Sequence, residues 1–466
     1  MKHSKKLASL LLALVMALSL AVTAFADEST TYSITINNST AGHTYEAYQI
    51  FTGDLATNEA GNKVLSNIVW GSGVSEAGQT ALGDAAAKAE TLKTEADAKA
   101  FAKAVAPYLT TAAGSANTVT DGKYVISGLA AGYYLVKDQD GSLIGDNDSY
   151  TEYIIQVVGN VTATPKSDVP EVQKKVKDIN DSTDTTKTDW QDSADYDVND
   201  KVPFQLTATL PTKEDDFAAY KTYKLVFTDN QSVGLTYPEA SGFIVKYEET
   251  VVPASQYTLT LNPTTTTADS TFTLTINDVK SLKDADGSDI AVAAGGKFTV
   301  EYESTLNNKA VIGHEGNPNE AKLQYSNNPN YTGEGENSPT GETPEDKVIV
   351  FTYQLNVNKT FDQGDPAESD MPKFTLYKKY KNGESEEWNK VGEEITLTRG
   401  GTEGHFTYTG SFSRIDDGEY KLVETHTPAG YNTAADTLFT ITADHEVLSD
   451  NPALTSLKIN QTDGDK

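Results

Sequence analysis

The chain has 466 residues, no cysteine and a formal net charge of −30 at pH 7. This acidic balance argues against binding to nucleic acid or to anionic lipid, whose phosphate groups would repel it. Disulfides are excluded, so any covalent stabilisation must come from another kind of bond.

The first 26 residues have the three parts of a secretory signal peptide. A basic start precedes an apolar run over residues 7–22, and an Ala-x-Ala pattern ends at Ala26. The run is short for a membrane span and has a cleavage site behind it. We therefore predict cleavage after Ala26 and a mature protein outside the cytoplasmic membrane.

The first predicted domain, residues 27–167, combines strands with helices. Patterns typical of strands cover residues 31–36, 45–51, 123–127, 132–137 and 153–158. Residues 76–109 are rich in Ala, Glu and Lys, which favours one or two helices.

The connector over residues 164–176 carries two lysines with different expected environments. Two prolines bracket Lys166, and proline disfavours helix in the residue before it, so Lys166 is expected on an exposed, extended segment. Lys174 alternates with two valines, so a strand here would point it toward a core. The alternative is a linker lysine and a lysine at a strand end, because lysine is rarely buried unless it is paired.

Two further domains of β-sandwich type are predicted. Residues 168–332 are rich in Thr, Val and Tyr, with turn residues at short intervals and strand patterns at 223–229 and 297–302. Residues 333–346 read as a Gly-, Asn-, Pro- and Glu-rich linker. The third domain, residues 347–466, has strand patterns at 348–359, 374–377, 418–424 and 437–441.

Each of these two domains offers a lysine and an acid on apolar faces. Lys174 and Lys359 lie on the first strand of their domains, in register with apolar residues, and Asp229 and Glu424 share faces with apolar residues of later strands. One such pair alone is consistent with a plain salt bridge. The repetition of the arrangement points to a shared purpose.

Burial suggests what that purpose is. Desolvation lowers the pKa of a lysine and raises that of a carboxyl group, so a buried pair can rest as a neutral amine and a protonated acid. The amine can then attack the carbonyl of a neighbouring Asn, while the acid carries the proton. The product is an isopeptide bond within the domain, formed with release of ammonia.

Several motifs resemble the middle domain of Gram-positive backbone pilins. They lie at residues 170–176, 228–229 with 234–236, 303–311, 316–319 and 325–329. Residues 420–431, YKLVETHTPAGY, resemble the E-box of Cna B-type domains. The resemblance implies tandem Ig-like domains with Lys–Asn isopeptide bonds promoted by Asp or Glu, and a pilin-specific sortase that joins subunits through a lysine in a Pro-Lys motif.

Carried onto this sequence, the family pattern assigns the middle bond to Lys174 and Asn307, with Asp229 as the acid. Asn308 is the alternative acceptor, because strand parity places it on the apolar face. The Pro-Lys motif falls on Lys166, although Thr164 stands where the family usually has an aromatic residue.

In the third domain the resemblance assigns Lys359 and Glu424 and leaves the acceptor open. Asn460 is the only late Asn near a strand. The family acceptor would lie just before an LPxTG sorting signal, so we expect both to follow residue 466. Lys359 is then expected to remain a free amine in this chain.

The resemblance implies a structural role rather than an enzymatic one, with no cofactor or metal. Its partners would be identical pilin subunits in a head-to-tail polymer, a sortase, and minor and tip pilins, at the cell wall. The histidines lack metal-ligand spacing, and the segment from Asp284 has Asp289 and Gly295 where a calcium loop has its sixth-place glycine and twelfth-place glutamate. The alternatives are an adhesin of the collagen-binding type, which needs no acceptor lysine at Lys166, and a secreted carbohydrate-binding protein or glycosidase appendage.

Overall fold

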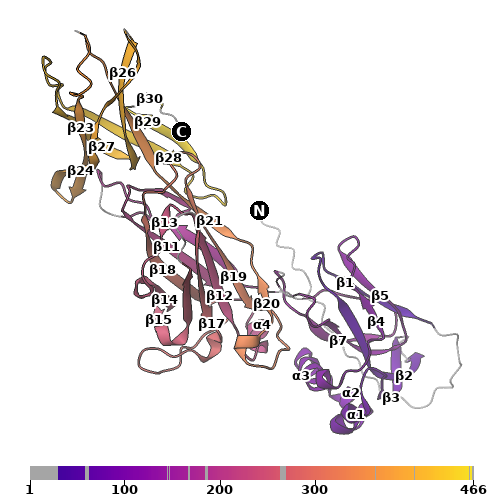
Figure 1. Cartoon of the computed structure of the whole chain (residues 1–466). Coiled ribbons are helices and arrows are strands. Elements are labelled where there is room, and N and C mark those ends of the chain that lie inside the picture. The colour runs from indigo at the N-terminus through magenta and orange to yellow at the C-terminus, as the bar shows by residue number, and fades with distance from the viewer. Residues whose placement is uncertain are drawn as a thin grey trace, which may run out of the picture. The chain divides into compact units, whose positions relative to one another are not determined.

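The chain forms two compact units, which are mainly β in this computed structural model (Figure 1). The described residues are 30–57, 62–143, 145, 147–165, 168–183, 187–262, 269–362, 364–403, 405–460 and 462–463. The predicted signal peptide and Lys166 lie outside them. The first unit consists of Met1–Val169, Pro211–Tyr223 and Tyr325–Glu342, and the second contains the rest. The mainly β fold class predicted from the sequence is confirmed.

The first unit contains two sheets. Its strands are β1 (Tyr32–Asn37), β2 (Tyr45–Thr57), β3 (Lys63–Trp70), β4 (Gly114–Ala116), β5 (Lys123–Leu129), β6 (Gly132–Asp138), β7 (Glu152–Val157) and β8 (Val161–Ala163). One sheet has the order β5-β1-β8 and the other β3-β2-β6-β7, with β4 on β2. On β6, Tyr133 and Leu135 enter the core beneath the helices, whereas Tyr134 and Val136 enter the core between the sheets. Both faces of β6 are therefore buried, which explains its continuous apolar sequence.

Three short helices stand where the sequence predicted one or two. They are α1 (Glu76–Leu82), α2 (Ala85–Thr91) and α3 (Glu95–Val105). The division comes from caps: Gly83 ends α1 with a φ of 89°, and Asp84 accepts a hydrogen bond from the N–H of Ala87 to begin α2. Thr94 and Asp97 form a capping box at the start of α3.

Two later segments also pack within the first unit, so it is not the continuous stretch 27–167 that the sequence predicted. They contain α4 (Glu214–Ala219) and β20 (Thr340–Glu342). The Lys103 ammonium donates to the carbonyl of Ala219 at 2.9 Å, and the Asn327 amide donates to the carbonyl of Leu143 at 2.7 Å. These contacts join residues far apart in sequence, which local patterns do not reveal.

The second unit begins with a sandwich of two sheets. Its strands are β9 (Glu171–Val176), β10 (Ser193–Asp195), β11 (Lys201–Thr209), β12 (Leu225–Gln231), β13 (Leu235–Thr236), β14 (Ile244–Tyr247), β15 (Thr250–Val251), β16 (Thr258–Asn262), β17 (Ser270–Ile276), β18 (Lys297–Leu306), β19 (Asn317–Ser326) and β21 (Asp346–Phe351). The sheets have the orders β10-β21-β19-β12-β17-β16 and β15-β14-β18-β11-β9, with β13 on β18.

A second sandwich completes this unit. Its strands are β22 (Tyr353–Lys359), β23 (Lys373–Asn382), β24 (Ser385–Thr396), β25 (Thr398–Thr402), β26 (His405–Ile415), β27 (Gly418–His426), β28 (Thr437–His445), β29 (Leu454–Ile459) and β30 (Thr462–Asp463). The sheets are β22-β26-β25 and β24-β23-β27-β28-β29-β30. The single strand predicted over 348–359 is divided at Thr352, because β21 pairs with β19 and β22 pairs with β26.

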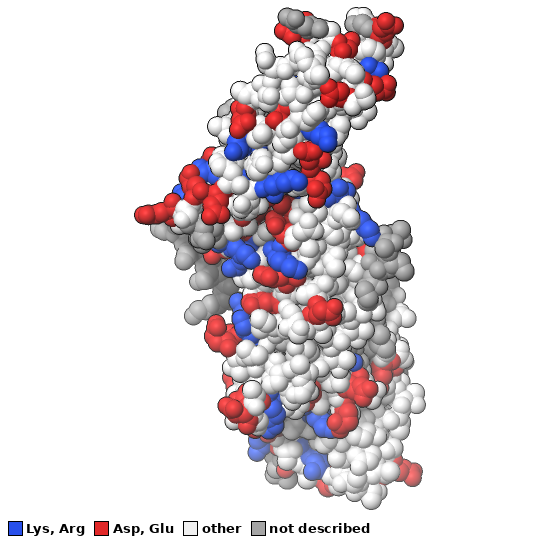
Figure 2. Space-filling view, turned by 60° about the vertical axis from the view of Figure 1, so that its left-hand side comes forward, with Lys and Arg blue, Asp and Glu red and all other residues white. Residues whose placement is uncertain are grey.

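The charged side chains on the surface include both acidic and basic residues. On the face shown in Figure 2, acidic and basic side chains are interspersed, and the described residues there form no continuous basic patch. In the described part of the chain, every helix is too short or too polar to cross a membrane.

Candidate functional site

A buried cluster at the centre of the first sandwich of the second unit joins Lys174, Asp229, Tyr302 and Asn319. Lys174 on β9 and Tyr302 on β18 come from one sheet, and Asp229 on β12 and Asn319 on β19 are on adjacent strands of the other. The Lys174 ammonium contacts the Asp229 carboxylate and lies 3.0 Å from the Tyr302 hydroxyl. The Tyr302 hydroxyl also lies 3.0 Å from Oδ1 of Asp229 and 2.9 Å from Nδ2 of Asn319.

Strand alternation explains why these polar side chains are in the core. Lys174 follows the inward parity of β9, and Asp229 follows that of Leu225 and Phe227 on β12. Lys174, Asp229 and Asn319 are each 0% exposed. Burial lowers the pKa of Lys174, although the Asp229 carboxylate opposes this shift. The site can therefore hold an amine that loses its proton more readily than a surface lysine.

The structure does not bring Asn307 or Asn308 into this cluster. Asn307 Nδ2 donates to the carbonyl of Val233 and to the hydroxyl of Thr236, both at 2.9 Å, and Asn308 is exposed. The reason is that β18 ends at Leu306, so strand parity does not extend to either residue. Asn319 is the asparagine at the site. Buried residues alternate along β19, and this period of two predicts that Asn319 points into the core. The assignment of Asn307 as acceptor is corrected accordingly.

Lys359 and Glu424 form the second predicted pair, between β22 and β27. The Lys359 ammonium lies 2.7 Å from Oε1 of Glu424, whose side chain is fully buried. The other carboxylate oxygen accepts the N–H of Ala434 at 2.6 Å. Asn460 is exposed, and its side-chain oxygen accepts the N–H of Thr440. Asn460 is therefore held by β28 rather than presented to Lys359.

A second fully buried lysine, which the sequence analysis missed, lies among three carboxylates. The Lys378 ammonium on β23 is 3.1 Å from Asp181 and 2.9 Å from Asp197, and it also contacts Asp416. Burial disfavours its charge, but the three carboxylates outweigh this and hold the pKa of Lys378 well above its usual value. Lys378 is thus a fixed cation, unlike Lys174, and it lacks a free lone pair for attack. Lys378 alternates with the apolar residues Phe374 and Leu376 along β23, and this sequence pattern predicts that its side chain is buried.

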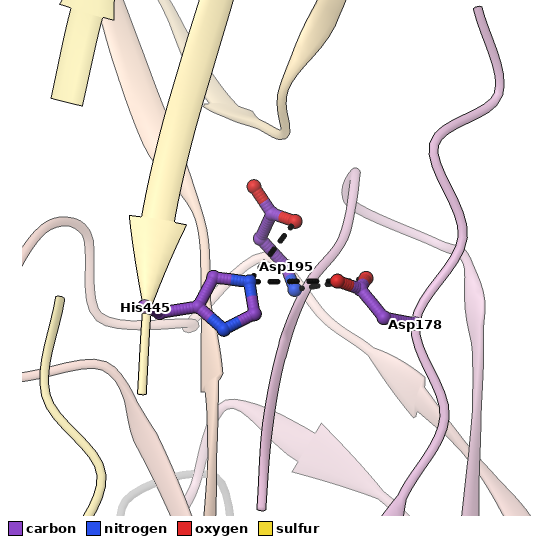
Figure 3. A group of neighbouring side chains, drawn as sticks. All are labelled: Asp178, Asp195 and His445. Carbon is purple, nitrogen blue, oxygen red and sulfur yellow. Dashed lines mark hydrogen bonds and ion pairs between the residues drawn. The ribbon is translucent and has the colours of Figure 1, made fainter. Parts of the chain in front are cut away.

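His445 on β28 points between two further carboxylates, Asp178 and Asp195, as Figure 3 shows. Nε2 lies 3.4 Å from Asp178 and 3.8 Å from Asp195. Nδ1 lies 2.7 Å from the hydroxyl of Ser193, which donates to the carbonyl of Glu446. Since that hydroxyl has only one hydrogen, Nδ1 must donate to it, and the ring carries both protons.

This arrangement makes the Figure 3 cluster an ion-pair network rather than a metal site. Burial lowers the pKa of His445, but its hydrogen bonds and charge interactions with the two carboxylates outweigh burial and raise it to about 10. A doubly protonated ring has no nitrogen lone pair to give to a metal ion.

The first unit contains a similar buried histidine. His43 Nδ1 lies 2.7 Å from Asp138 and Nε2 lies 3.0 Å from Asp148, and the ring stacks on Tyr45. Burial lowers the pKa of His43, but the two carboxylates outweigh it and raise the pKa to about 9. The charged ring therefore links β6 to the loop that follows it.

The first unit is expected to lose stability as the pH rises from 7 to 10. The folded pKa of His43 lies above the ordinary value of 6.5, so its contribution is complete below 6.5 and is lost as the pH passes 9. We expect a loss of about 2 kcal/mol between pH 7 and pH 10, less than the full shift would give because part of the contribution is already lost at pH 7, above the ordinary pKa of 6.5.

Trp70, which packs on Phe51 in this unit, can report the change if Trp190 and Trp388 are replaced by Phe. Urea unfolding followed by fluorescence at pH 7 and pH 10 measures the loss. His43→Gln in the same background is the control and should show a smaller difference between the two pH values. Equal differences in both proteins would contradict the assignment.

Comparison with known proteins shows which sequences this chain resembles. Residues 198–329 match the family model described as Gram-positive pilin backbone subunit 2, Cna-B-like domain. The trypsin-resistant surface T6 protein of Streptococcus pyogenes serotype M6 is 27% identical over 335 residues, which cover 70% of this chain and 54% of that protein. This chain thus spans about half the length of that relative.

One solved pilin structure supports the fold. The T6 backbone pilin of serotype M6 Streptococcus pyogenes is described as a modular three-domain structure. It matches with a TM-score of 0.55 at 19% sequence identity, and the match covers 90% of this chain and 83% of the T6 chain. The major pilin SpaD of Corynebacterium diphtheriae has a TM-score of 0.48 at 17% identity, over 89% and 92%. The similar proteins are pilin subunits rather than enzymes.

Proposed function

We propose that this chain is a structural shaft subunit of a covalently polymerised pilus on the cell surface, because residues 198–329 match the family model of the Gram-positive pilin backbone subunit. Its partners are further copies of itself in a head-to-tail polymer, a pilin-specific sortase, and minor and tip pilins. The chain contains three domains in this proposal, with the N-terminal unit followed by the two sandwiches.

The observation that supports this proposal best is the Lys174–Asp229–Asn319 cluster. It places an amine of lowered pKa, an acid and a side-chain amide together in one buried core. Attack of Lys174 Nζ on Cγ of Asn319 forms an isopeptide bond and releases ammonia, with Asp229 carrying the proton. The fold holds the groups together and so supplies the effective concentration that this slow reaction needs.

The bond would connect β9 to β19, strands that lie in opposite sheets of the sandwich. A covalent tie across the core resists pulling and proteolysis, because the sheets cannot separate without breaking it. This suits a cysteine-free shaft protein that works outside the cell. Lys359 and Glu424 form the corresponding pair of the last domain, ready for an Asn acceptor.

Lys166 is the proposed point of attachment between subunits. It stands in the Pro-Lys motif of the connector, and the prolines on either side predict an extended segment that a sortase could reach. Sortase would transfer the carboxyl end of one subunit to this amine. An adhesin of the collagen-binding type shares such domains but needs no acceptor lysine.

Lys166→Ala and Lys166→Arg are each expected to abolish covalent polymers. Both remove the nucleophilic amine at this position, and neither is expected to alter folding, because the sequence predicts a connector there and substitutions away from a core contribute little to stability. Denaturing gels of cell-wall extracts from the producing bacterium measure the result: wild type should give a ladder of high-molecular-weight bands and both variants a single band.

The neighbouring lysines Lys175 and Lys177 provide the controls for position. Their Ala variants should retain the ladder. A ladder that persists in both Lys166 variants would move the linkage to one of these residues, and a single band from wild type would favour the adhesin.

A further inference from the structure

The Tyr302 hydroxyl touches every group that the proposed bond formation requires. It lies 3.0 Å from Lys174 Nζ, 3.0 Å from Asp229 Oδ1 and 2.9 Å from Asn319 Nδ2. Nδ2 is the atom that must leave as ammonia. The hydroxyl therefore stands between the nucleophile, the acid and the leaving group.

Hydrogen counting defines the resting arrangement. A tyrosine hydroxyl has one hydrogen to donate and lone pairs to accept with. The Lys174 ammonium and the Asn319 amide nitrogen can only donate, so the Tyr302 hydroxyl accepts from both and donates to Asp229. Burial raises the pKa of Tyr302 well above 10, and the Asp229 charge adds to this shift, so the phenol keeps its proton.

The acid Asp229 makes no direct hydrogen bond to the leaving group of Asn319. Within the described residues, the Asp229 side chain pairs with Lys174, Tyr302 and Tyr237, and no hydrogen bond joins it to Asn319. The Asn319 carbonyl oxygen, Oδ1, is buried without a partner there. Tyr302 is thus the hydrogen-bonded link from Asp229 to Asn319.

We propose that Tyr302 is a catalytic residue of isopeptide formation, which relays a proton from Asp229 to the departing amide nitrogen of Asn319. This inference rests on the proposed function and specifies how ammonia leaves. The reaction starts from neutral Lys174 and from Asp229 protonated at Oδ1, with the Tyr302 hydroxyl turned toward Nδ2.

The proton transfers balance without an added acid or water. The bond from Lys174 Nζ to Cγ of Asn319 forms, and the bond from Cγ to Nδ2 breaks. Nζ gives one proton to Oδ2 of Asp229, Oδ1 of Asp229 gives its proton to Tyr302, and Tyr302 gives its own to Nδ2. Ammonia leaves, and Asp229 and Tyr302 end with the same number of protons as they had at the start.

Tyr302→Phe tests the relay, and Tyr237→Phe is its matched control. The Tyr237 hydroxyl donates to the same oxygen of Asp229 at 2.6 Å. Within the described residues it has no hydrogen bond to Lys174 Nζ or to Asn319 Nδ2. The Tyr302 ring stacks on Phe204 and Phe243, and phenylalanine keeps these contacts. The two variants thus differ in whether the lost hydroxyl reaches Asn319.

The measurement follows newly synthesised full-length chain in a cell-free system. Samples are denatured in acid at intervals, and intact mass gives the fraction that has lost ammonia. Tyr302→Phe should slow the loss by at least about tenfold, as expected when a positioned proton donor is removed, and Tyr237→Phe should slow it much less. Equal rates in the two variants, or a wild-type rate in Tyr302→Phe, would overturn the relay.

Two further measurements separate other causes of failure. Wild-type protein that never loses ammonia would refute the proposed bond itself rather than the relay. Tyr302→Phe combined with Asn319→Ala should have the same circular dichroism and protease resistance as Asn319→Ala alone. If it does, the slow reaction of Tyr302→Phe reflects chemistry; if it unfolds instead, the relay is rejected in favour of a structural role.

Discussion

Asn319→Ala should abolish the loss of ammonia from the middle sandwich, whereas Asn307→Ala should retain it. The wild-type protein is expected to weigh about 17 Da less than its sequence mass for each bond formed. Removing the acceptor amide leaves Lys174 unlinked, so the Asn319→Ala protein should have its full sequence mass. Lys174→Ala should give the same result, and Asp229→Ala should too, because the amine would lose its proton carrier.

Stability should change with the mass. The proposed bond would close a loop from residue 174 to residue 319, and a cross-link over more than 100 residues can contribute about 5 kcal/mol by restricting the unfolded chain. Urea unfolding of wild type and Asn319→Ala measures this difference, with Asn307→Ala as the control because its side chain bonds only near the end of β18. Loss of ammonia from Asn319→Ala, or its absence in Asn307→Ala, would show that the acceptor is wrongly assigned.

The predictable part of the site is the part that strand alternation determines. Lys174 and Asp229 were identified because each shares a parity with apolar neighbours, and period-two alternation specifies which side chains enter a core. Asn319 obeys the same rule on β19. The family pattern assigns Asn307 instead, and sequence parity alone does not reveal that β18 ends at Leu306.

Contacts between residues far apart in the chain are the part of the fold that the sequence does not predict. Residues 211–223 and 325–342 join the first unit through contacts with residues more than 100 positions away, such as that between Lys103 and Ala219. The partners of Lys378 likewise come from three separate segments, at residues 181, 197 and 416. Alternation could place Lys378 in a core, but only the fold shows that three acids surround it.

These three acids make Lys378 the residue whose loss should most affect the second unit after the cross-link itself. Lys378→Met keeps the apolar stem and removes the charge. It leaves Asp181, Asp197 and Asp416 without their shared cation, and breaking a buried charge cluster in this way costs about 3–5 kcal/mol. Lys379→Met is the matched control, because the Lys379 ammonium is on the solvent side with Glu386 and Glu419 and should matter little.

The cost of Lys378→Met should grow with pH. Burial already raises the pKa of Asp416 well above its ordinary value, and the neighbouring Asp197 adds to this, while Lys378 opposes it. Without the lysine, the folded-state pKa values of Asp197 and Asp416 rise further above those of the unfolded chain, because Lys378 opposes both shifts. Acids of this kind stabilise the fold at low pH and lose that contribution as the pH rises through their folded pKa.

Urea unfolding at pH 5 and pH 8, with hydrogen exchange of β23 to locate the change, measures this effect. Lys378→Met should lie close to wild type at pH 5 and well below it at pH 8, since protons can replace the missing cation only while the acids remain protonated. Lys379→Met should follow wild type at both pH values. A deficit of Lys378→Met that is equal at the two pH values would mean that the three carboxylates do not depend on Lys378 for their charge balance.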